Sequence, residues 1–153
     1  RPPRSTPSNS SAASDVYKRQ TTDEMIAIMK NYHDPSKTRY GLSYPINVFS
    51  VAAFVHAFDG YYYDDRTDKC GLNSQGTIEG IRFLVEKIKP YMLQDIDYGV
   101  QTALFTEGKA PLSINGPWYF SVADEGGLNW ELAKLPTIPG VGPLKPFMGY
   151  RHL

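Results

Sequence analysis

The sequence predicts an α/β fold in which helices cover a central, largely parallel β-sheet. Between residues 21 and 153, short segments rich in β-prone residues alternate with segments of helical apolar periodicity. The 153 residues are enough for one domain with a sizeable core and too few for two. Hydrophobic residues make up 41% and charged residues 21%, which is typical of a folded domain and not of a disordered chain.

The composition excludes several classes of function. No run of 18 or more apolar residues occurs, so these residues contain no transmembrane helix. The 16 basic and 16 acidic side chains balance, and this leaves no basic excess to attract nucleic acid. The unusual feature is the aromatic content of 13%, which indicates a surface or cleft for ring-shaped partners, although cores use aromatic residues too.

Residues 1–20 differ from everything that follows them. They are rich in Ser, Pro, Arg and Asn, and they contain just two sizeable apolar side chains, Val16 and Tyr17. No continuous apolar run marks a secretory signal there. The stretch SSAASDVYKRQ resembles a translated sequencing-adaptor artefact. We interpret 1–20 as a non-native leader, with a genuine disordered tail as the alternative.

The first predicted elements are a helix over about 22–32 and a strand over 39–44. Thr21 and Glu24 form a capping-box pattern before the apolar periodicity of this helix. The helix is expected to end before Pro35, because the residue before a proline avoids the helical region. Pro45 then stops the strand.

The next segment, 47–58, is apolar all round, which indicates a buried helix or a buried strand. Ala52 and Ala53 favour the helix. The three tyrosines at 61–63 have the composition of a strand, and 64–71 reads as a charged loop.

The clearest helix covers about 75–91. Asn73 and Ser74 are its candidate N-caps, and Pro90 bends or ends its last turn. Apolar residues recur at helical spacing along it, at Ile78, Ile81, Leu84, Val85 and Ile88.

A helix over 98–106 follows, capped by Asp97 and closed by Gly108. Residues 110–114 form the next predicted strand, and Pro117 suits the first position of another helix. Gly126-Gly127 ends that helix, 128–135 has the pattern of a strand, and 139–146 is a Gly/Pro-rich connection.

No motif selects catalytic residues or a metal site. A G-x-S-x-G elbow and phosphate-binding loops are absent, and no motif singles out a carboxylate pair. His56 lies in an apolar segment, where a core or interface role is the simpler interpretation. Arg66 breaks the EF-hand pattern of the acidic loop 64–68, and Cys70 has no partner for a disulfide. We expect no catalytic residue, no metal and no cofactor.

The remaining candidates are aromatic residues at the starts of predicted elements. Trp118 directly follows a strand-to-helix turn, and ligand crevices in open α/β sheets lie at such strand ends. Phe49 and Tyr98 also begin segments that follow turns. Each alone fits a core position, but their joint placement indicates a sugar site, because C–H faces of sugars stack on aromatic rings.

An ordered series of motifs runs along 21–153. The motifs are Gly41-Leu42-Ser43-Tyr44, Gly71-Leu72-Asn73, Phe105-Thr106-Glu107-Gly108-Lys109-Ala110, Ser113-Ile114-Asn115-Gly116-Pro117-Trp118, Leu135-Pro136-Thr137-Ile138-Pro139-Gly140 and Lys145-Pro146-Phe147. In this order they resemble one known family, the maltose/maltodextrin-binding type of extracellular solute-binding proteins, which deliver sugars to ABC importers.

The resemblance implies an incomplete lobe of a two-lobed periplasmic-binding-protein-like fold of type II. Residues 21–143 would form the second, C-terminal-type α/β lobe, and 144–153 would cross the hinge back towards the first. Such proteins are more than twice this length and the sequence has no initiating Met, so we expect an internal fragment.

The resemblance also implies ligand-binding roles. Trp118 matches a tryptophan that stacks on bound sugar, and Phe120 falls where maltodextrin binders have a second aromatic residue. Tyr98 matches a tyrosine that lines the cleft, and Phe49 falls near another aromatic contact. Asn47 falls near a position that is acidic in the maltose binder, and Asn keeps the hydrogen bonding but loses the charge.

The implied function is the carbohydrate-binding component of an ABC transporter, which captures a malto-oligosaccharide or related sugar by hinge closure. It would be a monomeric, extracytoplasmic protein, periplasmic or a lipoprotein, whose partners are the sugar and the permease subunits, and not an enzyme. Two alternatives remain. A carbohydrate-active enzyme or accessory sugar-binding module would use the same aromatic residues, and a structural module with an aromatic core would not respond to sugar.

Overall fold

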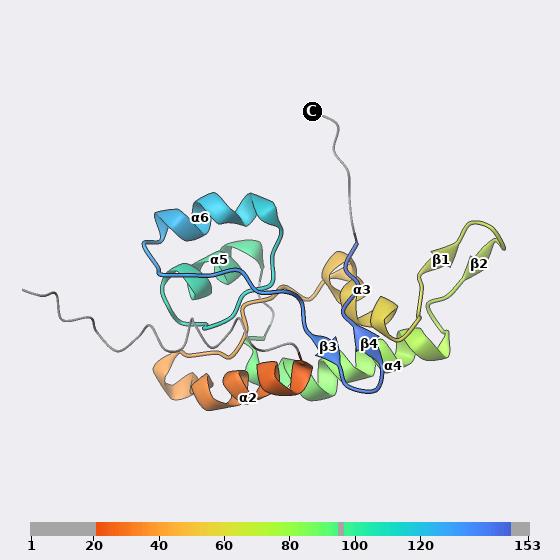
Figure 1. Ribbon diagram of the computed structural model, residues 1–153, viewed down its shortest axis with the longest axis horizontal. Coiled ribbons are helices and arrows are strands. Elements are labelled where there is room, and N and C mark those ends of the chain that lie inside the picture. The colour runs from red at the N-terminus through yellow and green to blue at the C-terminus, as the bar shows by residue number, and fades with distance from the viewer. Residues whose placement is uncertain (1–20, 95–96, 148–153) are drawn as a thin grey trace, which may run out of the picture.

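The computed structural model describes residues 21–94 and 97–147. The expected leader, 1–20, and residues 148–153 of the expected hinge crossing lie outside the described residues. Helices dominate this part of the chain, and α5 and α6 lie together on one side of it, while α3 lies above α4 (Figure 1). The α-helices are α2 (Thr22–Tyr32), α3 (Val48–Ala57), α4 (Gln75–Phe83), α5 (Tyr98–Thr106) and α6 (Phe120–Glu125).

Side chains at the N-caps determine where the helices begin. The predicted capping box of α2 is present: the Glu24 N–H donates to Thr21 Oγ1 at 3.3 Å, and the Thr21 N–H donates to the Glu24 carboxylate at 3.1 Å. Ser74 caps α4 and Asp97 caps α5, as predicted. Residues 48–57 form a helix, which decides between the two interpretations of that segment, and Asn47 caps it.

The long helix predicted over 75–91 changes type along its length. It is α-helical to Phe83, continues as the π-helical segment η2 (Leu84–Ile88) and ends in the 3-10 turn η3 (Lys89–Tyr91), which contains Pro90. Leu84 and Ile88 are buried, whereas three other residues of the predicted apolar face are exposed: Ile78, Ile81 and Val85. The apolar face is therefore wider than the surface that α3 covers.

The largely parallel central sheet is absent from the described residues, and this correction concerns several predicted strands. Two antiparallel hairpins are present instead. They pair β1 (Tyr63–Asp64) with β2 (Lys69–Cys70) and β3 (Thr137–Ile138) with β4 (Gly142–Pro143). The predicted loop 64–71 is thus largely a hairpin, and only Tyr63 of the predicted strand 61–63 enters β1. Residues 128–135 form no strand, because most of them are exposed and no segment within 21–94 or 97–147 pairs with them.

Parallel pairing survives as isolated bridges. Leu42 pairs with Met92, Ser43 pairs with Ser113, and Thr21 pairs with Thr137. The first two bridges place residues 42–43 between Met92 on one side and Ser113 on the other. The predicted strands 39–44 and 110–114 therefore do lie side by side. Pro45 and Pro111 have no amide N–H to donate, which limits the length of the ladder here.

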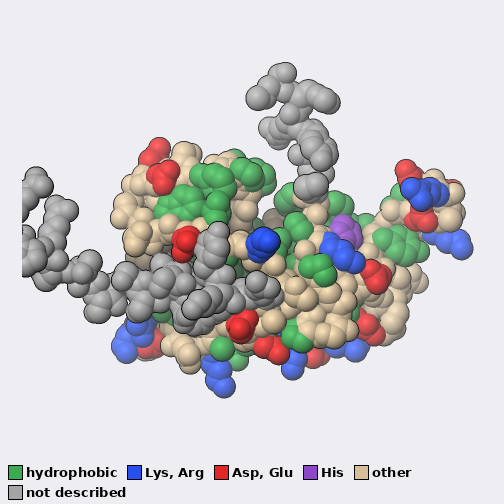
Figure 2. Space-filling view, viewed as in Figure 1, with side chains coloured by type: hydrophobic (Ala, Val, Ile, Leu, Met, Phe, Trp, Pro, Cys, Tyr) green, Lys and Arg blue, Asp and Glu red, His purple; other side chains and the backbone are tan. Residues whose placement is uncertain are grey.

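The core lies between α3, α4, η2 and α2. Its largest fully buried side chains include Phe54 of α3, Met29 of α2, and Leu84 and Ile88 of η2. Charged side chains gather along the edge formed by α2 and α4, and hydrophobic side chains gather over α6 and α3 (Figure 2).

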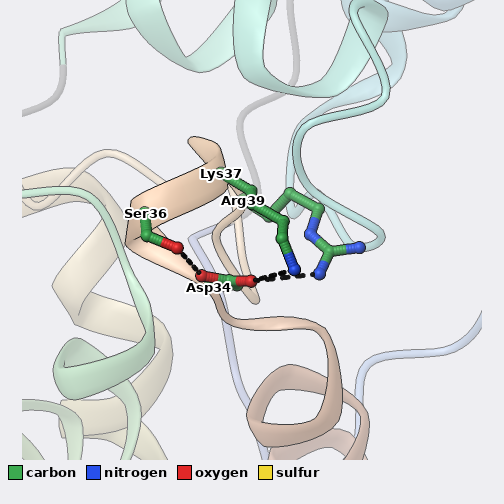
Figure 3. A network of polar contacts seen from close by, with 4 residues as sticks. All are labelled: Asp34, Ser36, Lys37 and Arg39. Carbon is green, nitrogen blue, oxygen red and sulfur yellow. Dashed lines mark hydrogen bonds and ion pairs between the residues drawn. The ribbon is translucent and has the colours of Figure 1, made fainter.

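A polar network closes the turn after α2 (Figure 3). The Asp34 carboxylate accepts a hydrogen bond from Ser36 Oγ at 2.6 Å and pairs with Lys37 Nζ at 3.0 Å and Arg39 Nη2 at 3.4 Å. The hydrogen bond from Ser36, followed by that from Lys37, lowers the pKa of Asp34 to about 2 from 3.8. The turn η1 (Pro35–Lys37) lies within this network.

The low pKa of Asp34 predicts that the folded state loses stability at low pH. Because the folded state favours the carboxylate, its contribution is fully present above pH 3.8 and is lost as the pH falls through about 2. Carboxyl ¹³C chemical shifts across this range should place the Asp34 midpoint near 2, and Ser36→Ala should raise it. A midpoint that stays at 3.8 in the native protein contradicts this network.

Tyr44 offers a test of the core. Its buried hydroxyl donates to the carbonyl of Ser50 at 2.5 Å, and burial raises the pKa of Tyr44 far above its usual value. Tyr44→Phe should lower the free energy of unfolding by about 1–2 kcal/mol, because the buried hydrogen bond to the Ser50 carbonyl is lost. Urea unfolding measures the change. Tyr61→Phe is the matched control, since the Tyr61 hydroxyl has no hydrogen-bond partner among the described residues.

Candidate functional site

The five residues predicted to bind ligand lie in two exposed places. Tyr98, Trp118 and Phe120 lie on the α5–α6 side and are here called the α5–α6 aromatic group. Phe49 and Asn47 lie at the start of α3. The exposed fractions of the aromatic side chains are 49% for Tyr98, 60% for Trp118, 38% for Phe120 and 54% for Phe49.

Trp118 lies in the 3-10 turn η4 (Pro117–Tyr119), with Pro117 at its first position as predicted. A Cβ added to Gly116 would come within 2.2 Å of the six-membered ring of the indole. The Trp118 ring therefore rests against the backbone of Gly116, which only the absence of a side chain permits. This contact orients the ring while more than half of the side chain remains open to solvent.

Tyr119, between two members of the group, anchors the turn to α5. It is buried, its hydroxyl donates to the carbonyl of Thr102 at 3.3 Å, and its ring packs 6.0 Å from that of Phe105. Burial raises the pKa of the Tyr119 hydroxyl, and the nearby Tyr98 adds a smaller effect in the same direction. Because Tyr119 points inward, its neighbours Trp118 and Phe120 are left on the surface.

The position of Tyr98 follows from the start of α5. Asp97 Oδ1 accepts a hydrogen bond from the Val100 N–H at 2.8 Å, and Tyr98 is the first residue of the helix. Thr102 lies one turn after Tyr98 on α5, and its carbonyl accepts the hydrogen bond from Tyr119, so the start of α5 lies near the turn that carries Trp118. Three of the predicted residues, from 98 to 120, therefore lie on the adjoining elements α5, η4 and α6.

A second aromatic group covers the start of α3. Phe49 stacks on Phe147, with ring centroids 5.9 Å apart and an interplanar angle of 27°. Phe147 also contacts the edge of His56 at 4.9 Å and lies 5.9 Å from Tyr62. His56 is half-buried, and its Nδ1 lies 3.1 Å from the carbonyl of Lys145, which agrees with the structural interpretation of this histidine.

Asn47 is the N-cap of α3. Its Oδ1 accepts a hydrogen bond from the Ser50 N–H at 2.9 Å and so caps α3. The side chain is exposed, and its Nδ2 has no hydrogen-bond partner among the described residues. The cap leaves this amide nitrogen free to donate to a ligand.

Two aromatic residues beside the predicted ones were not singled out from the sequence. Trp130 lies 5.6 Å from Phe120, ring to ring, and Phe147 stacks on Phe49. Trp130 belongs to the segment 128–135, whose alternating pattern predicted a strand. Phe147 belongs to one of the motifs that carry the family resemblance. No sequence signal predicted either ring contact, since both contacts join positions in different segments.

The described residues give little support for a metal site or for an acidic site in the loop 64–68. They hold no group of three His, Cys, Asp or Glu side chains placed to bind a metal ion. Asp64 instead accepts hydrogen bonds from the Arg66 N–H at 3.0 Å and from Thr67 Oγ1 at 2.7 Å, which close the β1–β2 turn. Within the same ranges, the helices are too short or too polar to cross a bilayer. The exposed aromatic rings are the distinctive surface of this part of the chain.

Comparison with known proteins identifies the family. Residues 11–152 match the family described as bacterial extracellular solute-binding protein. The chain belongs to this family. Its fold is accordingly of the periplasmic-binding-protein-like kind, and the described residues are a mixed helix and strand portion of it.

Three relatives carry names that refer to sugars. A maltotriose-binding protein of Pyrococcus abyssi is 42% identical over 119 residues, which cover 78% of this chain and 26% of that protein. A galactooligosaccharide-binding protein of Bacillus subtilis is 23% identical over 148 residues, 86% of this chain and 35% of the relative. A maltodextrin-binding protein of Bacillus subtilis is 34% identical over 85 residues, 52% of this chain and 20% of the relative. The chain thus spans about a fifth to a third of these relatives.

The contact between Trp118 and Gly116 can be tested directly. Gly116 has a φ of −90°, which alanine adopts without strain, so Gly116→Ala should act by displacing the indole. In a Trp130→Phe background, where Trp118 is the only described tryptophan, the emission maximum and acrylamide quenching should change. Gly99→Ala is the control, because its Cβ would meet only Asp97 at 3.4 Å. An unchanged spectrum for Gly116→Ala contradicts the contact.

Proposed function

We propose that this chain is part of the carbohydrate-binding component of an ABC sugar importer, with a malto-oligosaccharide or related sugar as ligand. The observation that carries the proposal is Trp118, an indole oriented by the Gly116 backbone and 60% exposed beside Tyr98 and Phe120. A pyranose ring presents an apolar C–H face that suits such a surface, and its hydroxyls suit polar groups around it. The names of two relatives, maltotriose-binding and maltodextrin-binding, support this ligand class.

The proposed mechanism is closure of two lobes on the sugar, with residues 21–143 in the second lobe and 144–153 leading across the hinge. Residues 144–147 are fixed to α3: the Lys145 N–H donates to the Ala53 carbonyl at 3.1 Å, and Lys145 Nζ pairs with Asp59 at 2.9 Å. A segment held in this way can serve as one rigid side of a hinge. Ligand contacts in both lobes would then favour the closed state.

In this proposal the protein binds its ligand without chemical change and needs no cofactor. It acts as a monomer outside the cytoplasm, either in the periplasm or as a lipoprotein on the outer face of the membrane, and delivers sugar to the permease subunits of the importer. Nucleic acid has no role. Family membership supports the binding role and the extracytoplasmic location, since the family is one of bacterial extracellular solute-binding proteins.

The test is the affinity of the full-length gene product for maltotriose, measured by isothermal titration calorimetry. Trp118→Ala should weaken binding about tenfold or more, because a central aromatic anchor is lost. Leu132→Ala, which removes another exposed apolar side chain, should leave the affinity unchanged. An effect of Trp118→Ala within about a factor of two would contradict the role of Trp118.

Recovery of the sugar distinguishes a binding protein from an enzyme. After incubation with stoichiometric protein, chromatography should return maltotriose intact. Shorter products that scale with the protein concentration would instead establish a carbohydrate-active enzyme. Absence of a heat signal with every malto-oligosaccharide and galacto-oligosaccharide tried would contradict sugar binding altogether.

A further inference from the structure

Trp130 makes two contacts with one side of α6. Its ring lies 5.6 Å from the Phe120 ring at an interplanar angle of 31°, and its Nε1 donates to Asp124 Oδ1 at 3.0 Å. Phe120 and Asp124 are four residues apart on the helix, so they lie on the same face, one turn from each other. The indole therefore spans one turn of α6.

The backbone after α6 delivers the indole to this place. Gly127 has a φ of +66°, in the left-handed region that favours glycine, and it reverses the chain at the end of the helix. Residues 128–136 then run without regular secondary structure until β3. Since this segment has no strand partner, its contacts with α6 are made by side chains, and Trp130 supplies the ring contact.

We propose that Trp130 is a positioning residue for sugar binding, which holds the Phe120 ring in its binding orientation and is itself oriented by Asp124. This inference rests on the proposed function. Phe120 is 38% exposed, so one part of its ring is free for a ligand, while the stack with Trp130 restricts its rotation. A ring that is held before the ligand arrives loses less conformational freedom on binding.

A double-mutant cycle with maltotriose and the full-length gene product tests this role. Trp130→Ala should weaken binding about twofold to tenfold, the range expected from loss of an aromatic pair. In a Phe120→Ala background, the same change should have no further effect, because Trp130 acts through Phe120. Trp130→Phe keeps a ring for the stack and should restore most of the affinity.

The hydrogen bond to Asp124 provides an independent readout. Asp124→Ala should weaken binding about twofold to threefold, and Asp124→Asn, which keeps an acceptor oxygen, should bind like the wild type. Glu125→Ala is the matched control, since it removes the same charge from the same helix and Glu125 has no hydrogen bond or ion pair among the described residues. This comparison decides the matter if Trp130→Ala does not fold.

Two outcomes overturn the inference. In one, Trp130→Ala costs as much affinity in the Phe120→Ala background as in the wild type. In the other, Asp124→Ala and Glu125→Ala bind sugar with equal affinity. Failure of the proposed function has a different signature. In that case the wild type does not bind sugar, or Trp118→Ala has no effect. A wild type that binds sugar, depends on Trp118 and shows no coupling between Trp130 and Phe120 refutes the positioning role alone.

Discussion

Reciprocal hydrogen bonds between Gln101 and Ser43 join α5 to the rest of the structure. Ser43 Oγ donates to the Gln101 carbonyl at 2.7 Å, and Gln101 Nε2 donates to the carbonyls of Ser43 and Ile114, each at 3.2 Å. Both Gln101 and Ser43 are almost fully buried, so a broken bond would leave a polar group unsatisfied at a cost of about 1–3 kcal/mol. These bonds give α5 one position against the parallel segments 42–43 and 113–114.

The position of α5 determines where the exposed aromatic rings lie. Tyr119 packs on α5 through Thr102 and Phe105, so the turn η4 and helix α6 follow α5. The inward direction of Tyr119 leaves Trp118 and Phe120 on the surface. Buried polar bonds thus fix the helix, a buried aromatic side chain fixes the turn, and the turn presents the rings. Each of these contacts limits the positions that the next element can take.

Exposed aromatic rings on a rigid support are suited to binding sugars. Burying aromatic rings away from water is favourable. Rings that remain exposed in the folded protein can therefore gain this free energy when a ligand covers them. The cost of ordering the site is lower where the rings are already held, as Trp118 is by the Gly116 backbone. In the proposed site, the exposed amide of Asn47 at the start of α3 would meet sugar hydroxyls. Hydrogen bonds then supply the specificity that stacking lacks.

The sequence by itself determined the helices, because caps and apolar periodicity are local signals: Thr21, Ser74 and Asp97 begin helices as predicted. It also singled out aromatic residues at the starts of elements as candidates for ligand binding, and Phe49, Tyr98 and Trp118 are exposed. Tertiary structure decided the strand pairing. The central sheet was predicted from the alternation of strand-like and helical segments, whereas the described part of the chain has isolated parallel bridges and two antiparallel hairpins. Tertiary structure likewise decided that Trp130 packs on Phe120. The pairing of strands and the packing of aromatic rings depend on partners that are distant in sequence. A local sequence pattern does not show which of those partners lies nearby in the fold.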